Sequence, residues 1–424
     1  LKISIMKKSK IFLYLLSFAL LSGCSKYESV EHVNVINNVS SSVIPLAEAL
    51  DNLEEVSYSI YGKTKSVIKD VKVTSFGGIK TKSGQSLPDT TLYIVNYGEN
   101  DGFAVLSAQR KMSTSVFCIT ENGKISVADL NEAYDKISRN SIVESSDTDE
   151  FESPGEEFVP MLIVSSAINQ MYYDSDDSIQ EPTTKSGYYY THQKYGPFLE
   201  TKWGQRKPFN TFRSDNAPTG CVATATAQIL QFIKRGNPDN MNFSWEKLAT
   251  VRNVKTPDYY GSSAAQKEAS RFLEYIGLKK NCRIKYSANS SSGNSYGAKR
   301  TLKNFGYPTV KRYVGFNNND QIRVRNSLSI GLPVYVDGNS GKNGHAWVID
   351  GMWVRSKYQD SKFVKTESMY HVNWGWYGIS DGYYEYGVFS KNSRVCIENG
   401  VDSGDIATDD FNYTWDFHTV IYSF

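Results

Sequence analysis

Cysteine and histidine are the side chains in this sequence that could together attack a carbonyl group. Cys221 stands in the stretch TGCVATATAQIL, where a Thr-Gly turn precedes a run rich in alanine and aliphatic residues. This pattern predicts a helix that begins at Cys221, with the thiol at the positive end of the helix dipole, which favours the nucleophilic thiolate. The alternative is a buried structural cysteine, the commoner role of an isolated cysteine.

A nucleophilic cysteine needs a base, and the chain has five histidines. His345 lies in GKNGHAWVIDGM, where a Gly/Asn loop leads into an apolar strand pattern. Gly344 beside it would let a substrate approach without interference from a side chain. His371, in YHVNWGWYG, begins a second strand pattern and is the second candidate. As an isolated residue, each is more often a packed core histidine than a base.

The elements that would position these residues fall into two regions. Residues 45–142 combine a helical pattern, IPLAEALDNLEEV, with strand patterns at KDVKVTSF, TTLYIVNYG and DGFAVLSA. Residues 144–157 hold seven acidic residues and no basic one, and a second polar stretch at 174–187 follows a helical pattern around EFVPMLIVSSAINQMYY. Both polar stretches are typical of solvated linkers. We place the main domain boundary near Lys185.

The N-terminus predicts export. Lys7, Lys8 and Lys10 precede the apolar run IFLYLLSFALL, which ends in LSGC and is short for a membrane span. The small residues before Cys24 resemble the lipobox of bacterial lipoproteins, which implies cleavage before Cys24 and acylation of its sulfur. The protein would then be anchored to the bacterial outer membrane, on its periplasmic or outer side. The matured form could be released from the membrane. The alternative is an ordinary secretory signal in which Cys24 has no role.

Composition argues against other classes of function. A formal net charge of +2 over 424 residues gives no indication of a basic surface that would bind nucleic acid. The sequence has no His-Glu-x-x-His run and no Cys-x-x-Cys pair, so a metal site has no local support. A chain of this length is expected to form more than one domain.

Three segments carry a resemblance to a known family. TGCVATATAQIL, GHAWVIDG and YHVNWGWYGISDGYY occur in this order, and Cys221 and His345 are 124 positions apart. Over residues 186–424 the chain resembles the streptopain family of secreted bacterial cysteine peptidases, which have a papain-like fold. The segment LYIVNYGENDGFAVLSAQRK is similar to that family's inhibitory pro-domain.

We therefore expect an α+β protein in three parts. Residues 1–24 form a lipoprotein-type signal peptide, residues 25–185 a small α+β pro-domain with its acidic linker, and residues 186–424 a papain-like catalytic domain. The catalytic domain would have a helix-rich half and an antiparallel sheet half. The pro-domain would inhibit the enzyme intramolecularly, so the exported chain would be a zymogen. Exposed linkers are where proteolysis should cut, and TTKSG near Lys185 is the preferred site.

The resemblance implies a role for each site residue. Cys221 would attack the scissile carbonyl, and His345 would form an ion pair with it and later protonate the leaving amine. Gln205, in TKWGQRKPFN, falls where papain-like enzymes keep the glutamine that joins the Cys221 backbone N–H in an oxyanion hole. Protein or peptide substrates are implied, and no metal or organic cofactor. A reducing milieu would keep Cys221 free.

The third catalytic position departs from papain, which orients its histidine with an asparagine two residues before a tryptophan. Side chains alternate along a strand, so Trp374 and Trp376 would share one face. His371 and Asn373 would share the other. The asparagine and the tryptophan of papain then correspond to Trp374 and Trp376, so that Trp374 takes the place of the asparagine. Streptopain-like enzymes are similar in this departure. Trp376 would shield the histidine contact from water, and Trp374 would set the ring orientation by packing. The alternative for both is core packing.

Two other functions stay open. A non-catalytic binding lipoprotein on a peptidase scaffold would be expected to have lost Cys221 or His345, and both are present. A Cys/His acyltransferase, such as a transglutaminase, shares the thioacyl chemistry but passes the acyl group to an amine. Cysteine pairing also stays open, because Cys282 and Cys396 could form a disulfide or remain thiols.

Overall fold

A computed structural model describes ten stretches of the chain. They are residues 42–62, 71–78, 87–139, 155–172, 188–236, 238–252, 261–340, 343–359, 361–389 and 416–424. Cys24 with the predicted signal peptide, the predicted cut near Lys185, and Cys396 all lie outside them. Within these stretches, every helix is too short or too polar to cross a membrane.

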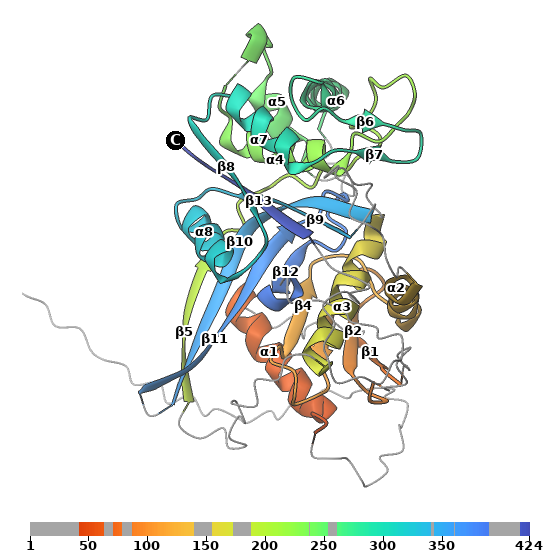
Figure 1. The fold of residues 1–424 in the computed structure, drawn as a ribbon, viewed down its shortest axis with the longest axis vertical. Coiled ribbons are helices and arrows are strands. Elements are labelled where there is room, and N and C mark those ends of the chain that lie inside the picture. Colours follow the sequence, from red (N-terminus) through yellow and green to blue (C-terminus); the bar gives the residue numbers. More distant parts are fainter. Residues whose placement is uncertain are drawn as a thin grey trace, which may run out of the picture. The chain divides into compact units, whose positions relative to one another are not determined.

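A large antiparallel sheet runs through the described residues (Figure 1). In spatial order its strands are β1 (Val71–Phe76), β2 (Leu92–Tyr97), β3 (Phe103–Ser107), β4 (Val116–Thr120), β12 (Gly382–Glu385), β11 (Lys362–Asn373), β10 (Asn343–Gln359), β9 (Val334–Ser340), β13 (Asp416–Ser423) and β8 (Thr309–Val314). The three strand patterns expected in the N-terminal region form β1, β2 and β3. The sheet continues from them into the strands that carry the candidate histidines.

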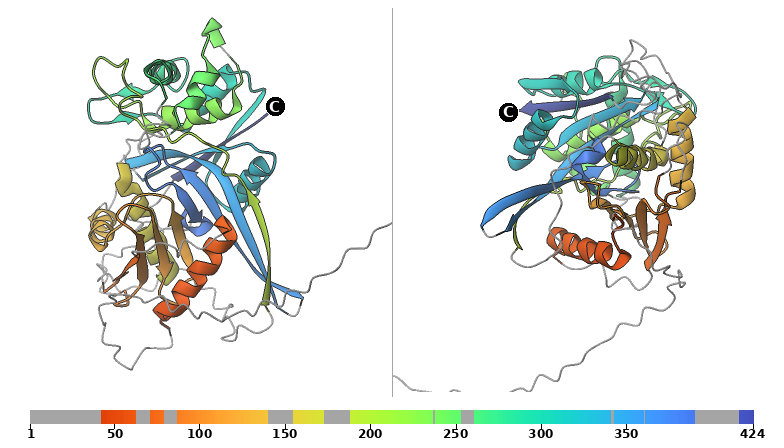
Figure 2. Two further views of the ribbon diagram at one scale, coloured as in Figure 1. Left: turned by 180° about the vertical axis from the view of Figure 1, so that it is seen from behind. Right: turned by 60° about the horizontal axis from the view of Figure 1, so that its bottom comes forward.

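A further strand, β5 (Tyr188–Tyr195), pairs with one half of β10, over residues 352–359. The other half of β10, residues 343–347, pairs with β9. Figure 2 shows β5, β10 and β11 as a long ribbon that extends beyond the other strands. β10 therefore has a half that pairs with β5 and a half that pairs with β9, and His345 lies in the half that pairs with β9.

The N-terminal strands join the rest of the sheet where β4 pairs with β12. Gly382 pairs with Thr120, and Tyr384 pairs with Cys118. A Cβ on Gly382 would lie 2.4 Å from the carbonyl oxygen of Ile119, so only glycine allows the two strands this close. Residues 41–424 form one compact unit. The domain boundary near Lys185 stays a prediction about processing, because residues from both sides of it share this sheet.

Three helices belong to the N-terminal region: α1 (Leu46–Tyr61), α2 (Val127–Arg139) and α3 (Phe158–Tyr172). α1 covers the helical pattern expected there, and it buries Leu53, Val56 and Ile60 against the sheet. α3 also forms where a helix is expected. Its side chains are buried at every position from residue 158 to residue 170, so it is a core helix with no solvent face.

The remaining helices gather at one end of the sheet (Figure 1). They are α4 (Cys221–Ile233), α5 (Trp245–Thr250), α6 (Ser263–Gly277) and α7 (Ser295–Asn304), with α8 (Asn318–Ser329) beside β13 and β10. Asn317 caps α8 through a capping box with Asp320. This end corresponds to the helix-rich half that was expected, and the sheet to the other half. The α+β, papain-like prediction is confirmed.

Strand alternation separates two hydrophobic cores. Val336, Trp347 and Ile349 pack in one core, together with α3. Tyr335, Ala346 and Val348 pack in the other core, together with α4. Because neighbouring residues of one strand point to opposite faces, the core that includes α3 and the core that includes α4 lie on opposite faces of β9 and β10.

Candidate active site

Cys221 is the first residue of α4, as its sequence predicts. Gly220 before it has φ 88° and ψ 139°, a backbone conformation that favours glycine, and its carbonyl oxygen accepts the Thr224 N–H at 3.0 Å. Thr219 donates its N–H to the carbonyl oxygen of Gln205 at 2.8 Å. The turn therefore fixes the thiol at the helix N-terminus and ties it to the Gln205 loop.

Burial disfavours the ionised form of the Cys221 thiol. Burial raises the pKa of Cys221 to about 12, the backbone N–H of Ala346 opposes this by donating to the sulfur, and the Asp337 carboxylate adds to the rise. Only 1% of the residue is exposed. Desolvation outweighs the helix-terminal position from which the sequence predicts a thiolate.

His345 is fully buried near the beginning of β10. Its Nε2 lies 2.7 Å from the carbonyl oxygen of Trp374, and its ring stacks on Trp376 with centroids 4.4 Å apart. The ring of Phe158, from α3, lies 5.6 Å away. Burial lowers the pKa of His345 to about 3, so the imidazole is neutral and donates from Nε2.

The imidazole of His345 and the thiol of Cys221 face different cores. The rings around His345 belong to the core of α3, whereas Cys221 packs with Ala346 in the core of α4. The structure therefore brings the histidine to the two tryptophans and the cysteine to the Gln205 loop. The ion pair between thiolate and imidazolium stays a prediction about the processed enzyme.

Trp374 and Trp376 stack on each other, with centroids 5.4 Å apart and planes at 11°. Trp376 covers the His345 ring directly. The shielding role expected for Trp376 stays a prediction. Trp374 holds the imidazole through its carbonyl oxygen, while its own Nε1 donates to Ser380. β11 ends at Asn373, so both indoles belong to the loop that follows the strand.

Asn373 hydrogen-bonds elsewhere, and because β11 ends at this residue, the strand alternation expected from His371 to Trp376 does not extend to the two tryptophans. Its Oδ1 accepts the side-chain N–H of Gln228 at 2.9 Å, and its Nδ2 donates to the carbonyl oxygen of Thr201 at 2.7 Å. Gln228 lies on α4, so Asn373 links that helix to the segment leading to Gln205. Gln205 is itself half-buried. Its oxyanion role stays a prediction.

His371, the second candidate base, is held in an ion-pair network. Its Nδ1 lies 2.6 Å from Asp350, and its Nε2 lies 3.4 Å from Glu121. Although burial alone would lower it, these two carboxylates raise the pKa of His371 to about 10. The same Glu121 accepts a hydrogen bond from Lys202 at 2.8 Å. A histidine that stays protonated at neutral pH is unsuited to act as a base.

Sequence reasoning overlooked a buried carboxylate–imidazole pair near Cys221. Asp337 and His418 are both buried, and their side chains lie 2.8 Å apart. The signal was present, because Asp337 interrupts the apolar strand pattern LPVYVDG, and a buried carboxylate requires a partner. That partner is 81 positions away and could not be found without the fold.

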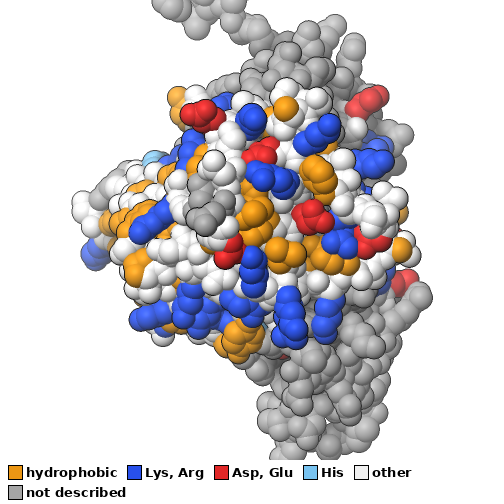
Figure 3. Space-filling view, turned by 90° about the horizontal axis from the view of Figure 1, so that it is seen from above, with side chains coloured by type: hydrophobic (Ala, Val, Ile, Leu, Met, Phe, Trp, Pro, Cys, Tyr) orange, Lys and Arg blue, Asp and Glu red, His pale blue; other side chains and the backbone are white. Residues whose placement is uncertain are grey.

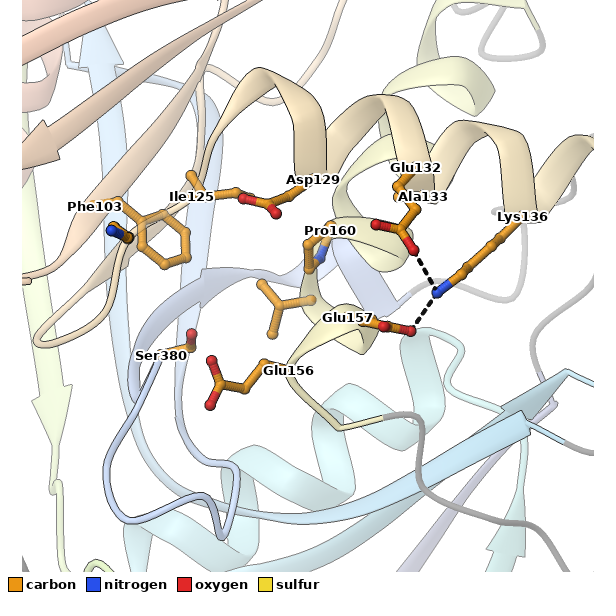
Figure 4. Close-up of a pocket in the computed structure, with 12 residues that line it drawn as sticks. Phe103, Ile125, Asp129, Glu132, Ala133, Lys136, Glu156, Glu157, Pro160 and Ser380 are labelled. Atoms are coloured by element: carbon orange, nitrogen blue, oxygen red, sulfur yellow. Dashed lines mark hydrogen bonds and ion pairs between the residues drawn. The ribbon is translucent and has the colours of Figure 1, made fainter. Parts of the chain in front are cut away.

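Cys282 is a buried free thiol in the structure, with its sulfur 3.3 Å from the Thr301 hydroxyl. A hollow of about 140 Å³ lies elsewhere, between α2 and α3 (Figure 4). At its rim Lys136 forms ion pairs with Glu132 and Glu157. The hollow does not include the residues of the candidate site. In the described stretches, no group of three or more histidine, cysteine or acidic residues is arranged to hold a metal ion.

Cys221 therefore lies at the start of a buried helix that packs against β10, the strand that carries His345. Residues 203–384 match the model of the peptidase C10 family. The chain is similar to that family over these residues, which include the three segments that carry the sequence resemblance.

The chain is also similar to individual proteins. Streptopain from Streptococcus pyogenes is 27% identical over 343 residues, which cover 72% of this chain and 76% of streptopain. The thiol protease/hemagglutinin PrtT from Porphyromonas gingivalis is 27% identical over 250 residues, covering 50% of this chain and 26% of PrtT. A solved fragment of Prevotella intermedia prointerpain A is similar with a TM-score of 0.47 and 19% identity, covering 82% of this chain and 98% of the fragment.

Proposed function

We propose that the chain is the latent precursor of an exported cysteine endopeptidase. The observation that carries the proposal is the position of Cys221, at the start of α4, with the backbone N–H of Ala346 directed at its sulfur and His345 next to Ala346 in the same strand. If the start of β10 rotated so that the imidazole of His345 faced Cys221, the two side chains would form a thiolate–imidazolium pair.

The reaction would then proceed through a thioester on Cys221. The Cys221 thiolate adds to the scissile carbonyl, and the oxyanion accepts hydrogen bonds from the Cys221 backbone N–H and the Gln205 side chain. His345 donates its proton to the leaving amine, and the thioester remains on Cys221. Water, deprotonated by His345, hydrolyses the thioester and releases the acid.

The burial of both residues supports latency. A neutral thiol and a neutral imidazole on different faces of β10 cannot react as an ion pair. Phe158 and the indole of Trp376 hold His345 in the α3 core, and the N-terminal strands extend the same sheet. We propose that the N-terminal region inhibits the enzyme by stabilising this arrangement and that proteolysis relieves it.

The direct test uses the full chain after incubation under reducing conditions, with a Cys221→Ala chain as the control. We expect new peptide termini from a substrate library with the wild-type chain and none with the control. Mass spectrometry of the products distinguishes hydrolysis from acyl transfer to an added amine. Equal cleavage by the Cys221→Ala chain would contradict the proposal.

Export and lipid anchoring form a separate part of the proposal, supported by the apolar run and by LSGC before Cys24. Expression in a bacterium fed a labelled fatty acid should label the wild-type chain. The Cys24→Ser chain should carry no label and should leave the membrane fraction. An unlabelled wild-type chain with a mature N-terminus beyond Cys24 would contradict lipid anchoring and leave the peptidase proposal intact.

A further inference from the structure

A buried carboxylate–imidazole pair lies on the Cys221 face of the sheet, apart from the residues to which a catalytic role is given above. Asp337, on β9, is 0% exposed, and His418, on β13, is 5% exposed. The Nδ1 of His418 lies 2.8 Å from Oδ1 of Asp337. Tyr335 donates its hydroxyl to the other carboxylate oxygen at 2.9 Å. Both oxygens of Asp337 are thus engaged.

The strand register places this pair beside the nucleophile. Asp337 is directly opposite Ala346 on β10 and directly opposite His418 on β13. Opposite residues of antiparallel strands point to the same face, with Cβ atoms about 4.5 to 5.5 Å apart. Ala346 and Tyr335 pack in one core with Cys221, and α4 packs on β9 and β10. The carboxylate therefore lies on the same face of the sheet as the thiol.

Simple electrostatics gives this arrangement a consequence for the thiol. A carboxylate in a buried site opposes the ionisation of a neighbouring thiol, because two negative charges repel strongly at low dielectric. The Asp337 carboxylate accordingly raises the pKa of Cys221. A proton on His418 would cancel the charge of Asp337 and remove this penalty.

We propose that Asp337 and His418 act together as a positioning pair for the nucleophile, in which the contact with His418 offsets the negative charge of Asp337 so that the Cys221 thiolate can form. The inference rests on the proposed function insofar as Cys221 is the nucleophile. Asp337 alone works against the thiolate, and His418 is the residue that offsets it. Tyr335 holds the carboxylate in place without changing its charge.

The test measures the alkylation of Cys221 by iodoacetamide in the full chain at pH 8, resolved by peptide mass spectrometry. Cys118 and Cys282 are buried and serve as internal references for opening of the fold. His418→Gln should slow alkylation of Cys221 relative to the references by about tenfold, the effect of a pKa rise of about one unit. Asp337→Asn should accelerate it, and the double variant should recover at least the wild-type rate.

Recovery in the double variant separates an electrostatic role from a structural one. If the pair only supports packing, the double variant will be as impaired as His418→Gln, which would overturn the proposal. An unchanged ratio in both single variants would also overturn it. If His418→Gln unfolds, all three cysteines will react faster together. Asp337→Asn is then compared with Tyr335→Phe, and equal effects of these two would exclude a charge effect.

Alkylation does not require turnover. A chain that hydrolyses no peptide could still show the predicted pattern, and an active peptidase could fail to show it. The result therefore distinguishes failure of this inference from failure of the proposed peptidase activity.

Discussion

At the scale of single residues, the thiol of Cys221 and the imidazole of His345 are each held in a defined position, and these positions belong to different cores. The thiol is placed by the Gly220 turn, and the imidazole by the Trp374 carbonyl and the Trp376 ring. Burial keeps both reactive groups neutral, with opposite shifts of their pKa values. What distinguishes the latent from the proposed active state is therefore the solvation and orientation of two side chains.

Gln205 provides the first residue-scale prediction. If its side chain donates to the oxyanion, Gln205→Ala should lower kcat of the processed enzyme by about 10²- to 10³-fold, because the loss of one such donor costs about 3 to 4 kcal/mol in the barrier. KM should change little. Steady-state kinetics on a peptide substrate provides the check. A rise in KM at constant kcat would assign Gln205 to substrate binding instead.

Trp376 provides the second. Its ring covers the imidazole of His345, whose pKa burial lowers to about 3. In the full chain, Trp376→Ala should admit water and raise the pKa of His345 toward the ordinary value of about 6.5. Trp376→Phe keeps a ring over the imidazole and should keep the pKa low. NMR titration of the histidine ring protons measures both. Identical titration of the two variants would contradict the shielding role.

At the scale of elements, the interface between β4 and the strands that follow residue 186 depends on Glu121. This carboxylate, next to the end of β4, contacts Lys202 and His371, both from the region beyond residue 186. Burial raises its pKa, but His371 and Lys202 outweigh burial and hold the pKa of Glu121 well below its usual value. Lys194, Asp350, Asp381, Tyr61 and Tyr383 also face this network.

The sign of the pH dependence follows from these shifts. The depressed pKa of Glu121 stabilises the docked N-terminal strands above about pH 4.5, and this contribution is lost as the pH falls. The pKa of His371, raised to about 10, adds stability that is complete below about pH 6.5 and is lost as the pH rises through 10. Docking should therefore be strongest between about pH 4.5 and 6.5.

Glu121→Gln should weaken this docking by about 3 kcal/mol, because it removes the negative charge that pairs with His371 and Lys202. The matched control is Glu55→Gln, which removes a half-exposed partner of Arg355 and should cost less than about 1 kcal/mol. Urea unfolding of the full chains from pH 3 to pH 8 measures both. Equal losses in the two variants, or an acid dependence unchanged in Glu121→Gln, would contradict the assignment.

The burial of α3 makes a prediction about processing. Leu162 and Ile163 pack in one core with Trp347 and Trp374, so withdrawal of this helix would leave a large cavity in that core. A cut within residues 140–157 would leave α3 in place, whereas release of everything before the predicted cut near Lys185 would remove it. We expect the active form to retain α3. N-terminal sequencing and intact mass decide, and an active form that begins at residue 186 without α3 would contradict this expectation.

Much of this organisation was open to sequence reasoning, and the remainder has physical reasons. The α4 start at Cys221 could be predicted because a Thr-Gly turn and an alanine-rich run are local signals. The side of the sheet that His345 faces could not, because it depends on packing against Phe158, nearly 190 positions away. The continuity of β4 with β12 likewise joins residues 118 and 384, and no local pattern encodes that pairing.

At the scale of the whole molecule, charge is divided between the two regions. Residues 186–424 contain 30 Lys and Arg against 20 Asp and Glu, a net charge of +10, while residues 1–185 carry −8. Figure 3 shows the face formed by the helix-rich end, where Lys and Arg side chains gather along one border. The near-neutral chain thus combines a basic and an acidic region.

Processing should therefore change how the protein interacts with charged surfaces. A form cut near Lys185 should elute from a cation exchanger at pH 7 at higher salt than the full chain, because it loses the acidic residues between 140 and 185. A mixture of full-length and processed Cys221→Ala chains, the latter cut with an added protease, allows the comparison without self-digestion. Co-elution of the two forms would show that the acidic region does not screen the basic one.

The pairing of β4 with β12 has a last consequence. Excision of the N-terminal strands would turn an interior strand into a border of the sheet, with amides and carbonyls along four residues open to water. Free borders of this kind recruit other strands, and Gly382 offers no side chain to obstruct an approach. The newly matured molecule would be more adhesive than its precursor, so its solubility would depend on how dilute it is when the N-terminal strands depart.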